Sequence, residues 1–215
     1  MVYLIFICLA VPLTLMLPLL KGQSRLLVCY MLIGAAVAVS AAEINAALQV
    51  LLGLDILDVS LRVAPVTEEV LKATPVLLFA LLGSDEEKHV LPLSMAVGIG
   101  FAVLENTWYL LSNLTAVTLG WAFLRGISAS LMHGICTFLV GCGILYVRKE
   151  RALFYTGIFG LLTAAITLHA TYNLLVATNW DTLGFVMPVA IYLIAQCVLH
   201  RHRLFRGYKA DRAAQ

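Results

Sequence analysis

Charged residues are scarce in this 215-residue chain: Asp, Glu, Lys and Arg make up 12% of it, whereas hydrophobic residues make up 62%. A typical soluble domain carries about 25% charged residues, so this composition excludes that class and favours a membrane protein. The sequence contains no second domain, no low-complexity segment and no convincing internal repeat. We therefore expect a single transmembrane domain over residues 1–200, followed by a basic cytoplasmic tail at 201–215.

Three common motif types are also missing. The first apolar run, residues 2–20, has no basic segment before it and no small-residue cleavage site after it, so we expect a retained helix rather than a removed signal peptide. The five cysteines lie in apolar runs without CxxC spacing, which indicates small hydrophobic side chains. No HExxH motif occurs, so a zinc site would have to be assembled from separate segments.

Seven apolar runs are long enough to cross a bilayer, which takes about 20 residues in a helix. Transmembrane strands would alternate over about ten residues, and these runs do not. The sequence predicts an all-α, polytopic membrane helical bundle with about seven transmembrane helices, at residues 2–20, 26–42, 63–82, 91–111, 119–146, 153–177 and 183–199.

Residues 43–62 mix polar and apolar side chains and are compatible with two structures. They form either an extension of the second helix followed by a loop, or a helix that lies in the membrane interface. The interfacial helix over 43–62 is slightly favoured, and neither choice changes the number of crossings.

The distribution of Lys and Arg predicts the orientation of the bundle. With the N-terminus outside, eleven of the fourteen Lys and Arg residues fall on the cytoplasmic side, and only Arg62 falls in an outer loop. The positive-inside rule therefore predicts an N-out, C-in topology. Lys72 and Arg125 fall within helices, and Arg125 either lies at the mouth of a site or reaches the interface by snorkelling.

Acidic and imidazole groups interrupt four of the predicted helices: Glu68 and Glu69, Glu105, His133 and His169. A charge at the bilayer centre costs at least about 2.5 kcal/mol, so such groups face one another, water or a bound ion. In the N-out topology each of the four helices carries its polar group about six to eight residues from its outer end. This shared depth predicts one site in the outer half of the membrane.

The third helix brings two carboxylates and a cation together. Glu68 and Lys72 are four residues apart, in the favourable order for an ion pair, and Glu69 lies about 100° around the helix. Two carboxylates in different environments can divide the roles of base and of ligand or acid. We expect Glu68 to be the general base, Glu69 to assist it, and Lys72 to set the charge on Glu68.

Histidines and carboxylates from separate helices suit a zinc ion that keeps one position open for water. The expected ligands are Glu105, His133 and His169, with Glu69 as a further candidate. His169 is also a candidate catalytic residue, and so is Asn173, which would orient His169 or donate to an oxyanion. A metal-free mechanism, in which Glu polarises water and His or Asn stabilises the oxyanion, fits the same residues.

The fourth predicted helix contains supporting residues around its acid. Phe101 lies one turn before Glu105, and Asn106 follows directly. Gly98 and Gly100 would let a neighbouring helix approach closely.

At four segments the chain resembles the PrsW family of intramembrane proteases, relatives of the CAAX-prenyl-protease and bacteriocin-immunity superfamily. The segments lie in order on successive predicted helices: EEVLK (68–72), FAVLEN (101–106), the segment around His133 and HATYN (169–173). The CAAX-protease branch would carry EExxxR and FxxxH. Here Lys72, one position early, and Glu105 stand in those places, which favours the PrsW branch.

This resemblance implies an intramembrane endopeptidase in the cell membrane of a bacterium or archaeon. Its substrate would be a single-span membrane protein, cut near the extracytoplasmic face; in bacterial PrsW that substrate is an anti-sigma factor. Glu68 and Glu69 would be catalytic carboxylates, and His169 a catalytic residue or ligand. The expected partners are this substrate and the lipid bilayer, with no nucleic acid.

Two other classes of protein compete with the protease. A proton- or cation-coupled transporter would place polar groups on both sides of the midplane, but the inner halves of these helices carry few. A non-catalytic membrane protein of the same superfamily would bind or protect a partner. It would tolerate Glu68→Gln, whereas the protease would not.

Overall fold

Helices make up the computed structural model, which describes residues 2–84, 86–115, 117–153 and 155–213, with the side chains of all of these except 148, 149, 151, 155 and 199–213. The long helices are α1 (Val2–Met16), α2 (Gly22–Leu52), α4 (Ala64–Leu82), α5 (Glu87–Ser112), α6 (Leu119–Lys149), α7 (Gly160–Val176) and α8 (Asp181–Ala213). The short helical segments are η1 (Leu17–Leu19), α3 (Ile56–Asp58), η2 (Val59–Val63), η3 (Arg151–Leu153) and η4 (Tyr155–Phe159). No strand occurs within the described ranges, which confirms the all-α prediction.

Six helical spans among the described residues are long and apolar enough to cross a membrane: Val2–Leu19, Gly22–Leu52, Glu87–Ser112, Leu119–Val147, Thr156–Val176 and Asp181–Val198. The seventh predicted span is α4, whose 19 residues include the charged side chains of Glu68, Glu69 and Lys72. The molecule is thus a helical membrane bundle. Its N-out, C-in orientation stays a prediction from the positions of Lys and Arg.

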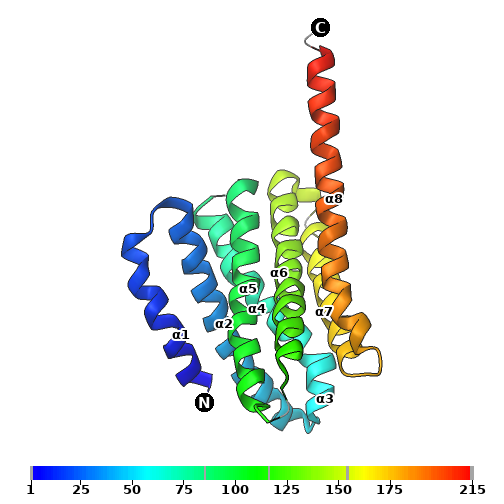
Figure 1. The fold of residues 1–215 in the computed structure, drawn as a ribbon. Coiled ribbons are helices and arrows are strands. Elements are labelled where there is room, and N and C mark those ends of the chain that lie inside the picture. The colour runs from blue at the N-terminus through cyan, green and yellow to red at the C-terminus, as the bar shows by residue number, and fades with distance from the viewer. Residues whose placement is uncertain (1, 85, 116, 154, 214–215) are drawn as a thin grey trace.

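The helices are arranged around α4, which contacts α2, α5, α6 and α7. In Figure 1, α5 lies between α2 and α6, α1 packs outside α2 at one edge of the bundle, and α8 lies at the other edge. Apolar core residues surround α4 on two sides. One cluster contains Val76, Val97, Met132, Cys136 and Tyr172, and the other contains Ile5, Ala38, Ala41, Phe101 and Leu104.

Glycines allow α5 to approach its two neighbours closely, as the sequence predicted. A Cβ atom on Gly98 would overlap the carbonyl of His133 in α6, and one on Gly100 would overlap the carbonyl of Met31 in α2. Small residues are the usual means of close helix contact in membranes, where burial of apolar surface provides little driving force. The turn of α6 that carries His133 is therefore packed directly on α5.

The prediction of an interfacial helix over 43–62 is wrong. Residues 43–52 continue α2, which ends only at Gly53, where φ is 63° and the glycine N–H donates to the carbonyls of Gln49 and Val50. After a short turn, the Asp55 carboxylate accepts from the N–H of Asp58 at 2.7 Å and starts α3. The polar residues Glu43, Asn45 and Gln49 line an open cavity between helices, which explains why their pattern resembles that of a surface helix.

The C-terminal helix α8 extends well beyond the rest of the bundle in Figure 1. It continues to Ala213, so residues 201–213 of the predicted basic tail are helical. The tail's side chains and residues 214–215 lie outside the described part of the chain.

Candidate active site

Helix α4 presents its two adjacent carboxylates in different directions. Glu69 and Lys72 are completely buried and face α6 and α7, where they contact His133 and His169. Glu68, one residue earlier, faces α2 and a cavity. Neighbouring residues in a helix point about 100° apart, so this separation follows directly from the sequence Glu-Glu.

A continuous chain of polar contacts runs from Glu69 to α6 and α5. The Lys72 ammonium lies 2.6 Å from Glu69 Oε1 and 2.8 Å from His133 Nδ1. Because an ammonium group only donates, His133 Nδ1 accepts from it, and the His133 proton is on Nε2. That nitrogen lies 3.1 Å from Glu105 Oε2, which also contacts the Arg125 guanidinium at 3.3 Å.

The predicted ion pair between Glu68 and Lys72 is wrong. Lys72 pairs with Glu69, at i,i+3, and not with the residue at i,i+4. Both spacings allow contact on a helix, so tertiary packing decides. The imidazole of His133 lies on the Glu69 side of α4 and holds the Lys72 ammonium there, and the Phe101 ring lies 4.6 Å from the same ammonium.

His169 links the two carboxylates of α4. Its Nδ1 lies 2.7 Å from Glu69 Oε1, and its Nε2 lies 3.8 Å from Glu68 Oε2. A carboxylate accepts only, so Nδ1 carries a proton, and Nε2 is the ring nitrogen that faces Glu68. A carboxylate that holds the far nitrogen of a histidine in this way is the usual support of a metal-binding imidazole.

Glu68 has one oxygen satisfied and one without a partner. Asn45 Nδ2 donates to Glu68 Oε1 at 3.3 Å, and Thr67 Oγ1 in turn donates to Asn45 Oδ1 at 2.5 Å. Glu68 Oε2 is buried and has no hydrogen-bond partner among the described atoms. This oxygen and His169 Nε2 face each other at 3.8 Å, which is too far for a direct hydrogen bond.

The charges of the cluster do not balance. The cluster contains three carboxylates, from Glu68, Glu69 and Glu105, but only two Lys or Arg cations. Lys72 pairs with Glu69, and Arg125 pairs with Glu105. Burying an uncompensated carboxylate is costly, because the group loses its hydration. The remaining negative charge falls on Glu68, so the site is built to receive a proton or a cation there.

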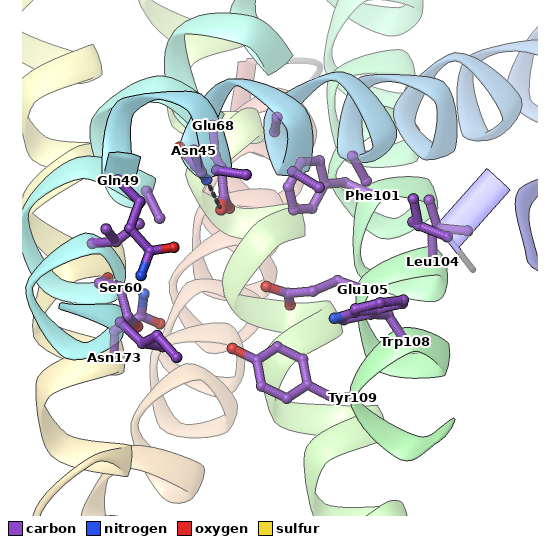
Figure 2. A pocket seen from close by; sticks show the side chains of 18 of the residues that line it. Asn45, Gln49, Ser60, Glu68, Phe101, Leu104, Glu105, Trp108, Tyr109 and Asn173 are labelled. Carbon is purple, nitrogen blue, oxygen red and sulfur yellow. Dashed lines mark hydrogen bonds between the residues drawn. The ribbon is translucent and has the colours of Figure 1, made fainter. Parts of the chain in front are cut away.

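A cavity of about 720 Å³ opens beside this cluster. Its wall includes Glu68, Glu105 and Arg125, whereas Glu69 and both histidines lie behind that wall. Figure 2 shows that the carboxylates of Glu68 and Glu105 and the hydroxyl of Tyr109 point into the same space. The cavity lies near the C-terminal ends of α2, α5 and α7 and the start of α4, so it belongs to one end of the bundle.

Asn173 lies at the cavity wall, and its amide is used to hold the backbone. Segment η2 is a π-helical turn in which the N–H of Ala64 donates to the carbonyl of Val59. The next amide in that pattern would come from Pro65, which has no N–H to give to the carbonyl of Ser60. Asn173 Nδ2 donates to this carbonyl at 2.9 Å, and Figure 2 shows the two residues side by side.

The two predicted supporting residues of α5 differ in position. The Phe101 ring lies 4.9 Å from the His133 ring, between centroids, and packs beside Lys72. Asn106 points towards α6, where its Nδ2 lies 3.5 Å from Ser130 Oγ, and its Oδ1 is buried without a partner. Phe101 therefore supports the cluster directly, while Asn106 joins α5 to α6.

The residues present fit a metal ion. Glu68, His133 and His169 each offer one ligand atom, and these atoms lie within 4.8 Å of one another. A tetrahedral zinc site with ligand distances of about 2.0–2.2 Å places its ligand atoms about 3.3–3.6 Å apart. The unpartnered Glu68 Oε2 and His169 Nε2, at 3.8 Å, are close to that spacing. His133 would have to break its contact with Lys72 or with Glu105 to become the third ligand. Glu105 itself, which the sequence predicted as a ligand, is not among these three residues.

Sequence reasoning missed Asn45, which holds Glu68 in place. The sequence contains a signal for it, because Asn45 and Gln49 are four residues apart and share one face of a helix. Of the two positions that the sequence allows for Arg125, the structure shows the one at the site: Arg125 is buried against Glu105, with 8% of its surface exposed.

Among the described residues, few buried polar side chains lie away from the cluster. Ser128 Oγ lies 2.9 Å from the hydroxyl of Tyr172, which lines the cavity, and Ser94 and Thr137 each donate to a carbonyl of their own helix. An ion path would need such groups on both sides. The described residues therefore give no support to a transporter.

Buried carboxylates at the wall of a cavity, with two imidazoles behind them in a helical membrane bundle, suit an intramembrane enzyme of the hydrolytic class. The chain belongs to the PrsW family of intramembrane metalloproteases, whose family model matches residues 22–199. No curated protein and no solved structure is significantly similar to it. The protein is thus a multi-pass membrane peptidase, and its substrate is a membrane protein. The family description implies a metal, which the Glu68, His133 and His169 group fits.

Proposed function

We propose that this protein is an endopeptidase that cuts a single-span, anti-sigma-factor-like membrane protein near the extracytoplasmic face. The observation that carries this proposal is the buried, unpartnered Glu68 Oε2, which lies 3.8 Å from His169 Nε2 at the wall of the cavity. The side of the membrane follows from the positions of Lys and Arg, because the cavity lies at the end of the bundle that they predict to be outside.

We assign Glu68, His133 and His169 as the metal ligands. We assign zinc as the metal, since two imidazoles and a carboxylate are a common set of catalytic zinc ligands. When bound, the ion supplies Lewis-acid polarisation of a peptide carbonyl and of water. Glu69 keeps the His169 proton on Nδ1, so that Nε2 is free to act as a ligand. Lys72 neutralises Glu69 and keeps it from competing for the ion.

We assign the general base to Glu105, in place of the Glu68 expected from the sequence. Glu105 reaches the cavity wall, whereas Glu69 is completely buried behind it. The Glu105 carboxylate is held by His133 and Arg125 through one oxygen, Oε2. A base fixed in this way can accept a proton from water without first reorganising.

The test uses the purified full chain in proteoliposomes with a single-span reporter protein. Wild type should cleave the reporter, and Glu68→Gln and His169→Ala should abolish both cleavage and the binding of zinc measured by elemental analysis. Glu105→Gln should abolish cleavage and keep the zinc. Glu43→Gln, a carboxylate of the same cavity wall without ligand-like neighbours, is the matched control and should retain both.

Two results would change the proposal. Cleavage that persists in Glu68→Gln and His169→Ala would exclude the assigned site. The other result has three parts: the variants do not cleave, a chelator has no effect on the wild type, and the wild type contains no zinc. This result would exclude the metal but would still support a peptidase that works through its glutamates.

A further inference from the structure

Arg125 occupies an unusual position for a charged side chain. It lies in the first part of α6, with 8% of its surface exposed, and contributes to the cavity wall. One of its nitrogens, Nη2, lies 3.3 Å from Glu105 Oε2. Its guanidinium carbon lies 3.7 Å from the centre of the Tyr109 ring and 5.7 Å from that of Trp121. The guanidinium is thus held in place by an acid and by two aromatic rings.

One donor of this guanidinium has no partner. A guanidinium has five N–H groups on three nitrogens, and the contact with Glu105 uses Nη2. Arg125 Nε is buried and has no acceptor among the described atoms. Buried donors are normally satisfied, so an unsatisfied one at a cavity wall indicates an acceptor that arrives with a ligand.

The chemistry of the cavity limits what this acceptor is. Glu105 already balances the charge of Arg125, and Glu43 and Glu68 contribute two more carboxylates to the same wall. A ligand with a permanent negative charge would be repelled by this wall. A peptide carbonyl is neutral when it binds and gains negative charge only during the reaction, so it suits a donor of this kind.

We propose that Arg125 is the oxyanion-binding residue of this site. This inference rests on the proposed peptidase function and on Glu105 as its base. Figure 2 shows the Glu105 carboxylate and the Tyr109 ring at the same part of the cavity, so base and donor act on one reacting group.

The step balances without a further reactant. The oxygen of water forms a bond to the carbonyl carbon of the substrate while its proton passes to Glu105. The π electrons of the carbonyl move to the carbonyl oxygen, where the free N–H groups of Arg125 donate to it. The carbonyl re-forms as the C–N bond breaks, and the leaving nitrogen takes the proton from Glu105, which gives an acid and an amine.

The test compares Arg125→Ala with Arg62→Ala, which removes an exposed arginine paired with Asp58. Kinetics are measured on the single-span reporter in proteoliposomes. Arg125→Ala should lower kcat about 100-fold, the usual effect of removing one oxyanion donor, while KM changes less than about threefold. Ethylguanidinium should restore kcat at least about tenfold, and ethylammonium at the same concentration should not, because only the first has the planar set of donors. Arg62→Ala should match the wild type.

A wild-type kcat in Arg125→Ala, or a loss that appears only in KM, would overturn the role of Arg125. If Arg125→Ala does not accumulate as folded protein, Arg125→Lys replaces it: it keeps the charge beside Glu105 and should still lose about 100-fold in kcat. A wild-type kcat in Arg125→Lys would overturn the inference. If Glu68→Gln abolishes cleavage but the Arg125 variants cleave like the wild type, the proposed peptidase function stands and only the role of Arg125 is rejected. A wild-type chain that does not cleave would reject both.

Discussion

Glu68 and Glu69 are adjacent in sequence, and each has one buried oxygen without a partner, yet Glu68 lines a cavity whereas Glu69 is fully buried between Lys72 and His169. The two carboxylates therefore differ in what their charge does. Glu69 compensates a cation and fixes an imidazole, so its charge stabilises the fold. Glu68 forms no ion pair with a described Lys or Arg, and its free oxygen faces His169, so its charge is available for a metal.

This difference predicts that the same substitution destabilises the protein at Glu69 but not at Glu68. Glu69→Gln should lower the free energy of unfolding by about 3–5 kcal/mol, because it leaves the Lys72 charge buried and unpaired. Glu68→Gln should leave the metal-free protein as stable as the wild type, because it removes an uncompensated charge. Thermal unfolding in detergent after chelation measures both. Equal destabilisation by the two variants would contradict this division of roles.

The Glu69–Lys72 pair should show strong coupling in a double-mutant cycle. Lys72→Met alone should destabilise by about 3–5 kcal/mol, while Glu69→Gln with Lys72→Met should lose less than the sum of the two single variants. The exposed Asp58–Arg62 pair, at 3.3 Å on the surface, is the matched control, and its coupling should be about 0.3–0.5 kcal/mol. Additive losses at Glu69 and Lys72 would show that the buried contact carries no net interaction.

Sequence reasoning located the helices and the polar cluster for a physical reason. Charged groups are costly in a membrane, so Glu68, Glu105, His133 and His169 stood out against their apolar surroundings. Their common depth in the predicted topology agreed with the contacts that now join them. Glycines before Glu105 likewise marked the close contact between α5 and α6.

The pairing of the charges could not be predicted in the same way. Residues at i+3 and i+4 are both within reach on a helix, and the choice of Glu69 over Glu68 by Lys72 depends on where α6 places His133. The path of residues 43–52 was also ambiguous, because polar side chains that face a cavity between helices have the same period as those that face headgroups. Both errors concern tertiary contacts between segments that are distant in the sequence.

The contact between Gly98 and His133 predicts that a single methyl group in α5 disturbs the site. Gly98→Ala would place a Cβ atom against the His133 carbonyl, and overpacking of this kind costs about 1–3 kcal/mol. A shift of about 1 Å in His133 should lower the cleavage rate about 100-fold. The control is Gly126→Ala in α6, which meets no atom within 4 Å and should gain up to about 1 kcal/mol from helix propensity. Full activity in a folded Gly98→Ala protein would contradict this prediction.

The hydrogen bond from Asn173 to the Ser60 carbonyl predicts that a substitution at Pro65 rescues the loss of Asn173. Asn173→Ala should destabilise by about 1–3 kcal/mol, because the carbonyl that Pro65 leaves without an amide loses its only donor in the described structure. Adding Pro65→Ala supplies a backbone N–H at the matching position of the π-helical turn, so the double variant should regain stability and cleavage together. Pro75→Ala, in the same helix but away from this turn, should rescue neither. Unfolding in detergent and reporter cleavage are measured on all four proteins. A double variant that is stable but inactive would show instead that the Asn173 amide takes part in the reaction.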